Sequence, residues 1–94
     1  MPSISEFYGI IIYMYWNEHN PPHFHAIYQD REVVVNIKTL EIMEGILPRR
    51  GLNLVLDWAE IHQEELLKNW NLCENMEHPN RIEPLIWELL CIGI

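Results

Sequence analysis

The stretch HFHAIYQDREVVVNIK, residues 23–38, indicates the fold class of this chain. Its first six residues alternate, so His23 and His25 leave one side of an extended strand while their neighbours leave the other. The polar residues 29–32 predict a turn, and the β-branched run 33–38 predicts the next strand. A connection this short favours an antiparallel hairpin.

Two further strands are expected, one on each side of this hairpin in the sequence. Residues 7–16 are aromatic and β-branched and hardly alternate, which predicts a strand buried on both sides. After a short turn at 39–41, residues 42–47 predict a fourth strand. The first half of the chain, residues 1–47, is therefore expected to form an antiparallel sheet of about four strands.

Residues 48–73 are expected to form one long amphipathic helix. Pro48 can open this helix, because the missing N–H of proline carries no cost at the first position. The apolar face holds seven residues at helical spacing: Leu52, Val55, Leu56, Ala59, Leu66, Leu67 and Trp70. The opposite, polar face carries Asp57, Glu60, Glu64 and Lys68. We therefore expect a single α+β domain over residues 1–94, with one long helix packed on the sheet.

Charge and cysteine content narrow the classes of function. The 94 residues carry a net charge of −8, so a broad basic surface for nucleic acid is not expected. Two cysteines without CxxC spacing indicate free thiols in a reducing compartment rather than a disulfide framework. No signal peptide or membrane span is apparent, so we expect a cytoplasmic protein.

A protein partner is expected from the surface of the predicted helix. A second, narrower apolar stripe holds Leu54, Ile61 and Leu72, and the carboxylates of Asp57, Glu60 and Glu64 form an acidic face. Isolated surface leucines are normal, so the alternative is a solvated face without a partner.

The apolar tail, residues 82–94, gives a second reason to expect an interface. A free tail of this composition would favour aggregation. It is therefore expected to pack on the sheet, to pair as a strand, or to be buried in a second subunit of a homo-oligomer.

Three of the five histidines lie around one proline turn and predict a metal site. His23 and His25 leave the same side of a strand, and His19 from the preceding turn could complete three nitrogen ligands for zinc or another divalent ion, with Glu18 near. Pro21 and Pro22 stiffen the connection. The alternative is structural, with the imidazoles bonded to backbone and pinning the turn.

A second hypothesis for the same histidines is nucleic-acid cleavage without a metal. His23 and His25 would act as general acid and base. Arg49 or Arg50, at the start of the predicted helix, would stabilise the charge on the phosphate. The alternative is that these arginines pair with surface acids, and the net charge of −8 also argues against a nuclease.

Three segments together resemble a known bacterial family. They are FYGIIIYMYWNEHNPPHFHAIY (7–28), LPRRGLNLVLDWAEIHQEELLKNW (47–70) and IEPL (82–85). Over about residues 1–85 the chain resembles the family called domain of unknown function 4160. The resemblance implies a product of a small two-gene unit, often beside domain of unknown function 2442, in an arrangement similar to a toxin–antitoxin module.

The resemblance favours a protein-interaction component of such a unit. Two alternatives remain open. One is an acidic inhibitor of the phage anti-defence type, whose carboxylates imitate the phosphates of a nucleic acid. The other is a histidine- or metal-dependent enzyme that resembles a nuclease.

Overall fold

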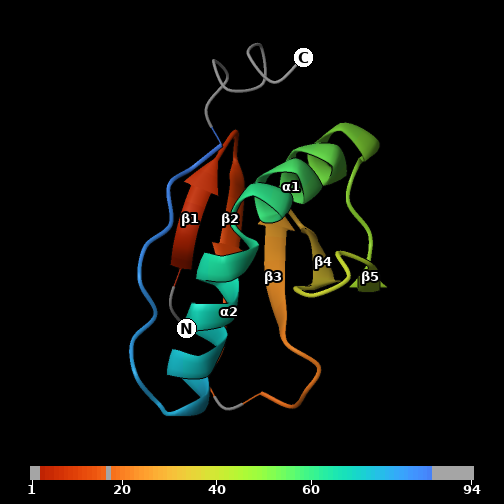
Figure 1. Ribbon diagram of the computed structural model, residues 1–94. Helices are drawn as coiled ribbons and strands as arrows, with labels where there is room; N and C mark the ends of the chain where they lie inside the picture. Colours follow the sequence, from red (N-terminus) through yellow and green to blue (C-terminus); the bar gives the residue numbers. More distant parts are fainter. Residues whose placement is uncertain (1–2, 17, 86–94) are drawn as a thin grey trace.

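The computed structural model describes residues 3–16 and 18–85, and their strands form one antiparallel sheet. The sheet has five strands in the order β1-β2-β3-β4-β5 (Figure 1). Their bounds are β1 (Ser3–Phe7), β2 (Ile10–Tyr13), β3 (His23–Tyr28), β4 (Arg31–Asn36) and β5 (Ile42–Gly45). The α+β class and the antiparallel pairing are confirmed, with one strand more than expected.

The additional strand arises because the predicted strand 7–16 is part of a hairpin. Phe7 ends β1 and pairs with Ile10, the first residue of β2. Tyr8 and Gly9 connect them with φ angles of 51° and 79°. Two left-handed residues in a two-residue loop match the twist of the flanking strands. The run of isoleucines and tyrosines around this turn hides it in the sequence.

Burial of β2 on both sides is also wrong, because the helices cover only one face of the sheet. Ile10 and Ile12 are buried, whereas Ile11 and Tyr13 on the other face are only partly buried. Among the described residues no helix lies over that second face (Figure 1).

Two helices replace the single helix expected over residues 48–73. They are α1 (Arg49–Ile61) and α2 (Gln63–Glu74), and the backbone of His62 separates them with φ −112°. One straight helix of that length would extend for about 39 Å. The longest dimension of the molecule is 37 Å. The bend lets both halves keep their apolar sides on one core.

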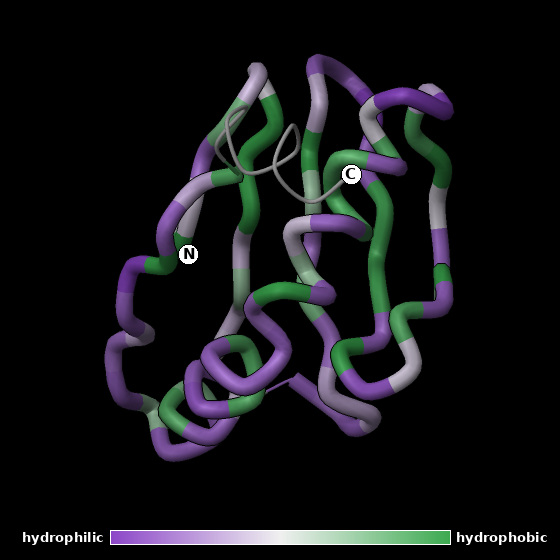
Figure 2. Tube along the Cα trace, turned by 45° about the horizontal axis from the view of Figure 1, so that its top comes forward, coloured by the Kyte–Doolittle hydropathy of each residue, from purple (hydrophilic) through white to green (hydrophobic). Residues whose placement is uncertain are grey.

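The core lies between the sheet and these two helices. Every residue of the predicted apolar face is buried or packed against this core. Trp58 is fully buried, with its ring centroid 5.5 Å from that of Phe7 and 5.9 Å from that of Phe24. In Figure 2 the helical turns alternate between hydrophobic and hydrophilic positions, as expected for helices with one buried face.

The chain after α2 covers the β1 edge of the sheet (Figure 1). The amide N–H of Ile82 donates to the carbonyl oxygen of Ile4 at 2.8 Å. Trp58 Nε1–H donates to the carbonyl oxygen of Glu83 at 2.8 Å. The first part of the predicted tail, 82–85, therefore packs on its own sheet. The rest, residues 86–94, lies outside the described residues, and with it the homo-oligomer expected through the tail.

Within the described part of the chain, neither helix is long and apolar enough to cross a bilayer.

Candidate functional site

A cluster of two histidines and a glutamate lies where β2 and β3 are connected. His23 and His25 stand at the start of β3 and are 7% and 9% exposed. Their ring centroids are 5.4 Å apart. The connection between the two strands returns beside β3 and carries Glu18 to both rings. The alternation expected for residues 23–28 therefore holds, and it gathers two imidazoles at one place.

An outer acceptor fixes the Nδ1 atom of each imidazole. His23 Nδ1 lies 2.8 Å from the carbonyl oxygen of Pro21, and a carbonyl oxygen only accepts, so Nδ1–H donates. His25 Nδ1 lies 2.7 Å from Glu32 Oε2 on β4, and it donates to this carboxylate in the same way. The neutral rings therefore carry their lone pairs at Nε2.

Both Nε2 atoms point at one oxygen of Glu18. Glu18 Oε1 is 2.8 Å from His25 Nε2 and 3.2 Å from His23 Nε2. If both rings are neutral, three lone pairs meet at this place. The resulting repulsion is relieved only when a proton or a cation lies between them. The ligand atoms of Glu18, His23 and His25 lie within 4.8 Å of one another, so the group can hold a metal ion.

The walls of the cluster are aromatic and its surroundings are negative. Tyr15 packs edge-on against His25 at 4.4 Å between ring centroids, and Trp70 of α2 lies 5.0 Å from the His23 ring. Burial raises the pKa of Tyr15 above its ordinary value, and the carboxylates of Glu32 and Glu18 raise this pKa further. The same negative field favours a cation beside His25.

The structure replaces the third ligand expected from the sequence. His19 is exposed and is not one of the three residues that form the cluster. Its neighbour Glu18 supplies the third ligand atom instead. Neither the HxH spacing nor the two prolines identifies which of two adjacent side chains turns inward. The sequence placed Glu18 near the expected site but did not identify it as the third ligand.

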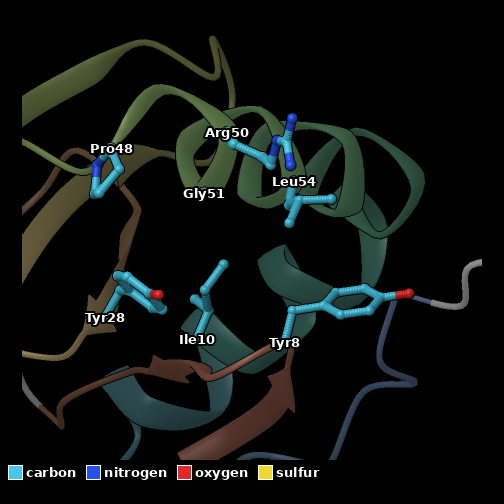
Figure 3. Close-up of a pocket in the computed structure, with 7 residues that line it drawn as sticks. All are labelled: Tyr8, Ile10, Tyr28, Pro48, Arg50, Gly51 and Leu54. Carbon is cyan, nitrogen blue, oxygen red and sulfur yellow. The ribbon is translucent and has the colours of Figure 1, made fainter.

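Arg49 and Arg50 lie far from the histidines, at the start of α1. Arg50 lines a separate pocket together with Tyr28, which is the last residue of β3, whereas His23 is the first (Figure 3). At about 3.3 Å per residue, these two ends of β3 are about 17 Å apart. The structure thus does not assemble the histidine–arginine arrangement that the ribonuclease hypothesis needs.

The residues expected to bind a partner lie on the helices. Asp57, Glu60 and Glu64 are exposed, and Ile61 is 56% exposed among them at the junction of α1 and α2. Leu54 differs, because it is partly buried against the core and lines the pocket that contains Arg50. Leu54 and Ile61 stand seven residues apart on α1 and so share one side of it, but Ile61 is the more exposed of the two.

Comparison with known proteins identifies the family of the chain but no individual relative. The family model described as a domain of unknown function (DUF4160) matches residues 9–71, which is more than half of the chain. The match is shorter than the resemblance over residues 1–85, and it includes both the histidine cluster and α1. No curated protein and no solved structure matches the chain.

Proposed function

The chain belongs to the DUF4160 family, and we propose that it is a member that binds a divalent metal ion through Glu18, His23 and His25. One observation carries the proposal: two nearly buried imidazoles direct Nε2 at the same carboxylate oxygen while an outer acceptor holds each Nδ1. In metal sites, ligating histidines usually donate their second N–H to such an acceptor, which orients the ring.

The distances within the cluster suit a small ion such as zinc. Two ligand atoms, each 2.0–2.1 Å from a tetrahedral ion, lie about 3.3 Å apart. The separations of 3.2 Å and 2.8 Å from Glu18 Oε1 to the two Nε2 atoms need only a small adjustment to reach that value. Two histidines and one carboxylate leave a coordination position open. A water or a substrate group would occupy it, so hydrolysis is the reaction class to assay once the ion is identified.

Glu32 is the positioning residue of the proposed site. Its carboxylate accepts from His25 Nδ1 at 2.7 Å, so it acts on the ion only through the imidazole. A carboxylate in this position fixes the ring and makes its Nε2 a stronger ligand.

The first test is the metal content of untagged protein that has been dialysed against a buffer containing trace amounts of divalent metal ions. We expect about one ion per chain in the natural protein and none in the His23→Ala, His25→Ala double variant. The matched control is His62→Ala, because His62 also bonds a carboxylate, that of Glu65 at 2.6 Å, but lies outside the cluster. Retention of metal by the double variant, or its absence from the natural protein after reconstitution, would overturn the proposal.

Partner binding in a two-gene unit is the second candidate function. It is supported by Ile61, which is 56% exposed between the exposed carboxylates of Asp57, Glu60 and Glu64. An exposed β-branched residue with acidic neighbours would complement a partner protein whose surface carries an apolar patch beside basic side chains.

The product of the adjacent gene is the partner to test. Ile61→Glu should weaken the complex at every salt concentration, because the apolar anchor is lost. Neutralising Asp57, Glu60 and Glu64 should weaken it mainly at low salt. An acidic inhibitor that imitates nucleic acid predicts the reverse order, with a small effect of Ile61→Glu and loss of binding on neutralisation. A complex that neither change affects would exclude this surface.

A further inference from the structure

A pocket lies at the end of β3 that is farther from the histidine cluster, between the sheet and the start of α1. Its volume is about 630 Å³ and its lining is mainly apolar. In Figure 3 the side chains of Tyr8, Ile10 and Tyr28 face the first turns of α1 across this pocket. Cavities of roughly 300–1,000 Å³ with apolar walls and a few polar groups are typical of small-molecule sites.

Arg50 adds one positive charge to this lining, and we call the cavity the Arg50 pocket. Within residues 3–16 and 18–85, none of the ion pairs involves Arg50. The first turn of α1 contains no acidic residue that could neutralise it. A guanidinium group binds a carboxylate through two parallel hydrogen bonds. A ligand with an apolar body and one carboxylate would therefore complement both the walls and the charge of the Arg50 pocket.

Gly51 leaves open space in the wall of the Arg50 pocket. Apart from proline, glycine is the least favourable residue inside a helix. Among the described residues, a Cβ built at Gly51 would meet only Ile10 Cδ1, at an ordinary contact distance of 3.9 Å. The packing of the described chain thus does not require glycine at this position. A ligand that approaches the backbone of α1 closely would require it.

We propose that the Arg50 pocket binds a small organic acid, with an apolar body between Tyr28 and Gly51 and its carboxylate at Arg50. Burial of the body against the apolar walls supplies most of the affinity. Arg50 is exposed, so its charge adds less and serves mainly to select acids over neutral compounds of the same shape.

The size of the Arg50 pocket favours a small molecule over a protein partner. Seven residues line it, whereas a stable protein interface involves roughly 20–30 residues on each side. The inference is independent of metal binding, because His23 and Tyr28 are the two ends of β3.

Titration of the isotope-labelled full chain with two probes of equal size tests the proposal. Naphthaleneacetate carries a carboxylate, and naphthaleneacetamide is its neutral counterpart. Amide chemical shifts measured by NMR report both the Kd and the place of binding. We expect saturable shifts at Gly9, Ile10, Tyr28 and Gly51 with both probes, and several-fold tighter binding of the acid than of the amide.

Two pairs of variants separate the charge of the Arg50 pocket from its shape. Arg50→Gln should abolish the preference for the acid and leave the Kd of the amide unchanged. Arg49→Gln is its matched control, because Arg49 is the neighbouring arginine but does not line the pocket. Gly51→Leu should fill the pocket and weaken both probes by about tenfold or more. Asn53→Leu, at an exposed position of α1 outside the lining, should not.

Three results would overturn the proposal: no saturable shifts at the pocket amides, equal affinity for the acid and the amide, or the same effect of Arg49→Gln and Arg50→Gln. Undiminished binding to Gly51→Leu would place the probes elsewhere and overturn it as well. If Gly51→Leu does not fold, the comparison of Arg50→Gln with Arg49→Gln still decides.

Discussion

The two ends of β3 bury different kinds of side chain. At its start, His23 and His25 are almost inaccessible, and their four ring nitrogens all lie within 3.2 Å of an oxygen. At its end, Tyr28 lines an apolar pocket in which the described residues leave about 630 Å³ open. Six residues of one strand thus connect a polar cluster with directed contacts to an apolar hollow.

The two ends differ in how strictly burial restricts the identity and position of the neighbouring residues. A buried polar group without a partner costs about 1–3 kcal/mol, so the histidine end requires Pro21, Glu18 and Glu32 at fixed positions. An apolar surface requires area and shape, and many side chains supply them. We expect substitutions at the histidine end to change one measurable function, and substitutions in the shared core to weaken both ends together.

The largest effect is expected from a substitution in the core, which stabilises both ends of β3. Trp58→Ala should lower the free energy of unfolding by about 3–5 kcal/mol, because a large cavity would form beside Phe7 and Phe24. Trp16→Ala is the control, since Trp16 is 42% exposed and should cost far less. Urea denaturation followed by circular dichroism measures both. Equal losses of unfolding free energy in the two variants would show that the packing of Trp58 does not stabilise the core more than an exposed tryptophan does.

Metal binding should stabilise the histidine end selectively. At a free ion concentration 100 times Kd, the free energy of unfolding should rise by about 2.7 kcal/mol. For a domain of this size, the corresponding rise in Tm is on the order of 10 °C. Glu18→Gln should abolish most of the rise, whereas Glu60→Gln, an exposed carboxylate on α1, should keep it. A similar rise in both variants would place the ion elsewhere.

Within the histidine end, Glu32 and Glu44 separate positioning from simple charge. Both line a small pocket beside His25, but only Glu32 bonds the imidazole. Glu32→Gln should lower zinc affinity about 10–100-fold. Glu44→Gln should change the affinity little, because its charge is exposed and screened. Competition with a chromophoric chelator measures the two constants. Equal reductions would mean that Glu32 acts through charge alone.

The smallest expected effect concerns a histidine–carboxylate pair outside the cluster. His62 and Glu65 form a 2.6 Å contact at the junction of α1 and α2, where the Glu65 side chain is 51% exposed. Glu65→Gln should reduce the free energy of unfolding by about 0.2–1 kcal/mol, as surface ion pairs do. Thermal denaturation at low and high salt checks this. A loss as large as that of Trp58→Ala would instead make this pair the cause of the bend.

The sequence predicted the hydrophobic pattern of the helices well and their number poorly. The spacing of Val55, Ala59, Leu66 and Trp70 identified the buried face, and all four are buried. The break at His62 has no signal in this spacing, because the apolar period continues through it. The break lets both helices keep their buried residues on the same core, and the helix pattern alone does not contain the shape of that core.

In the histidine cluster, too, the sequence predicted one part of the arrangement and not the other. Alternation along residues 23–28 placed His23 and His25 on one side of a strand, and the structure agrees. The choice of Glu18 over His19 depends on the path of the connection between β2 and β3. Adjacent side chains point in different directions, so a small change in this path selects one and excludes the other.

The sequence by itself determined the α+β class, the antiparallel pairing, the apolar face of the helices and the histidines that share one side of β3. These features depend on neighbours a few residues apart, through strand alternation and helical period. Tertiary structure decided the β1–β2 hairpin, the bend at His62, the convergence of Glu18 and Glu32 on His25, and the distance between Arg50 and the histidines. The hairpin is local, but the isoleucines and tyrosines around its two-residue turn hide it in the sequence. The other features depend on residues that meet only after the sheet, its helices and its covering segment have packed on one core.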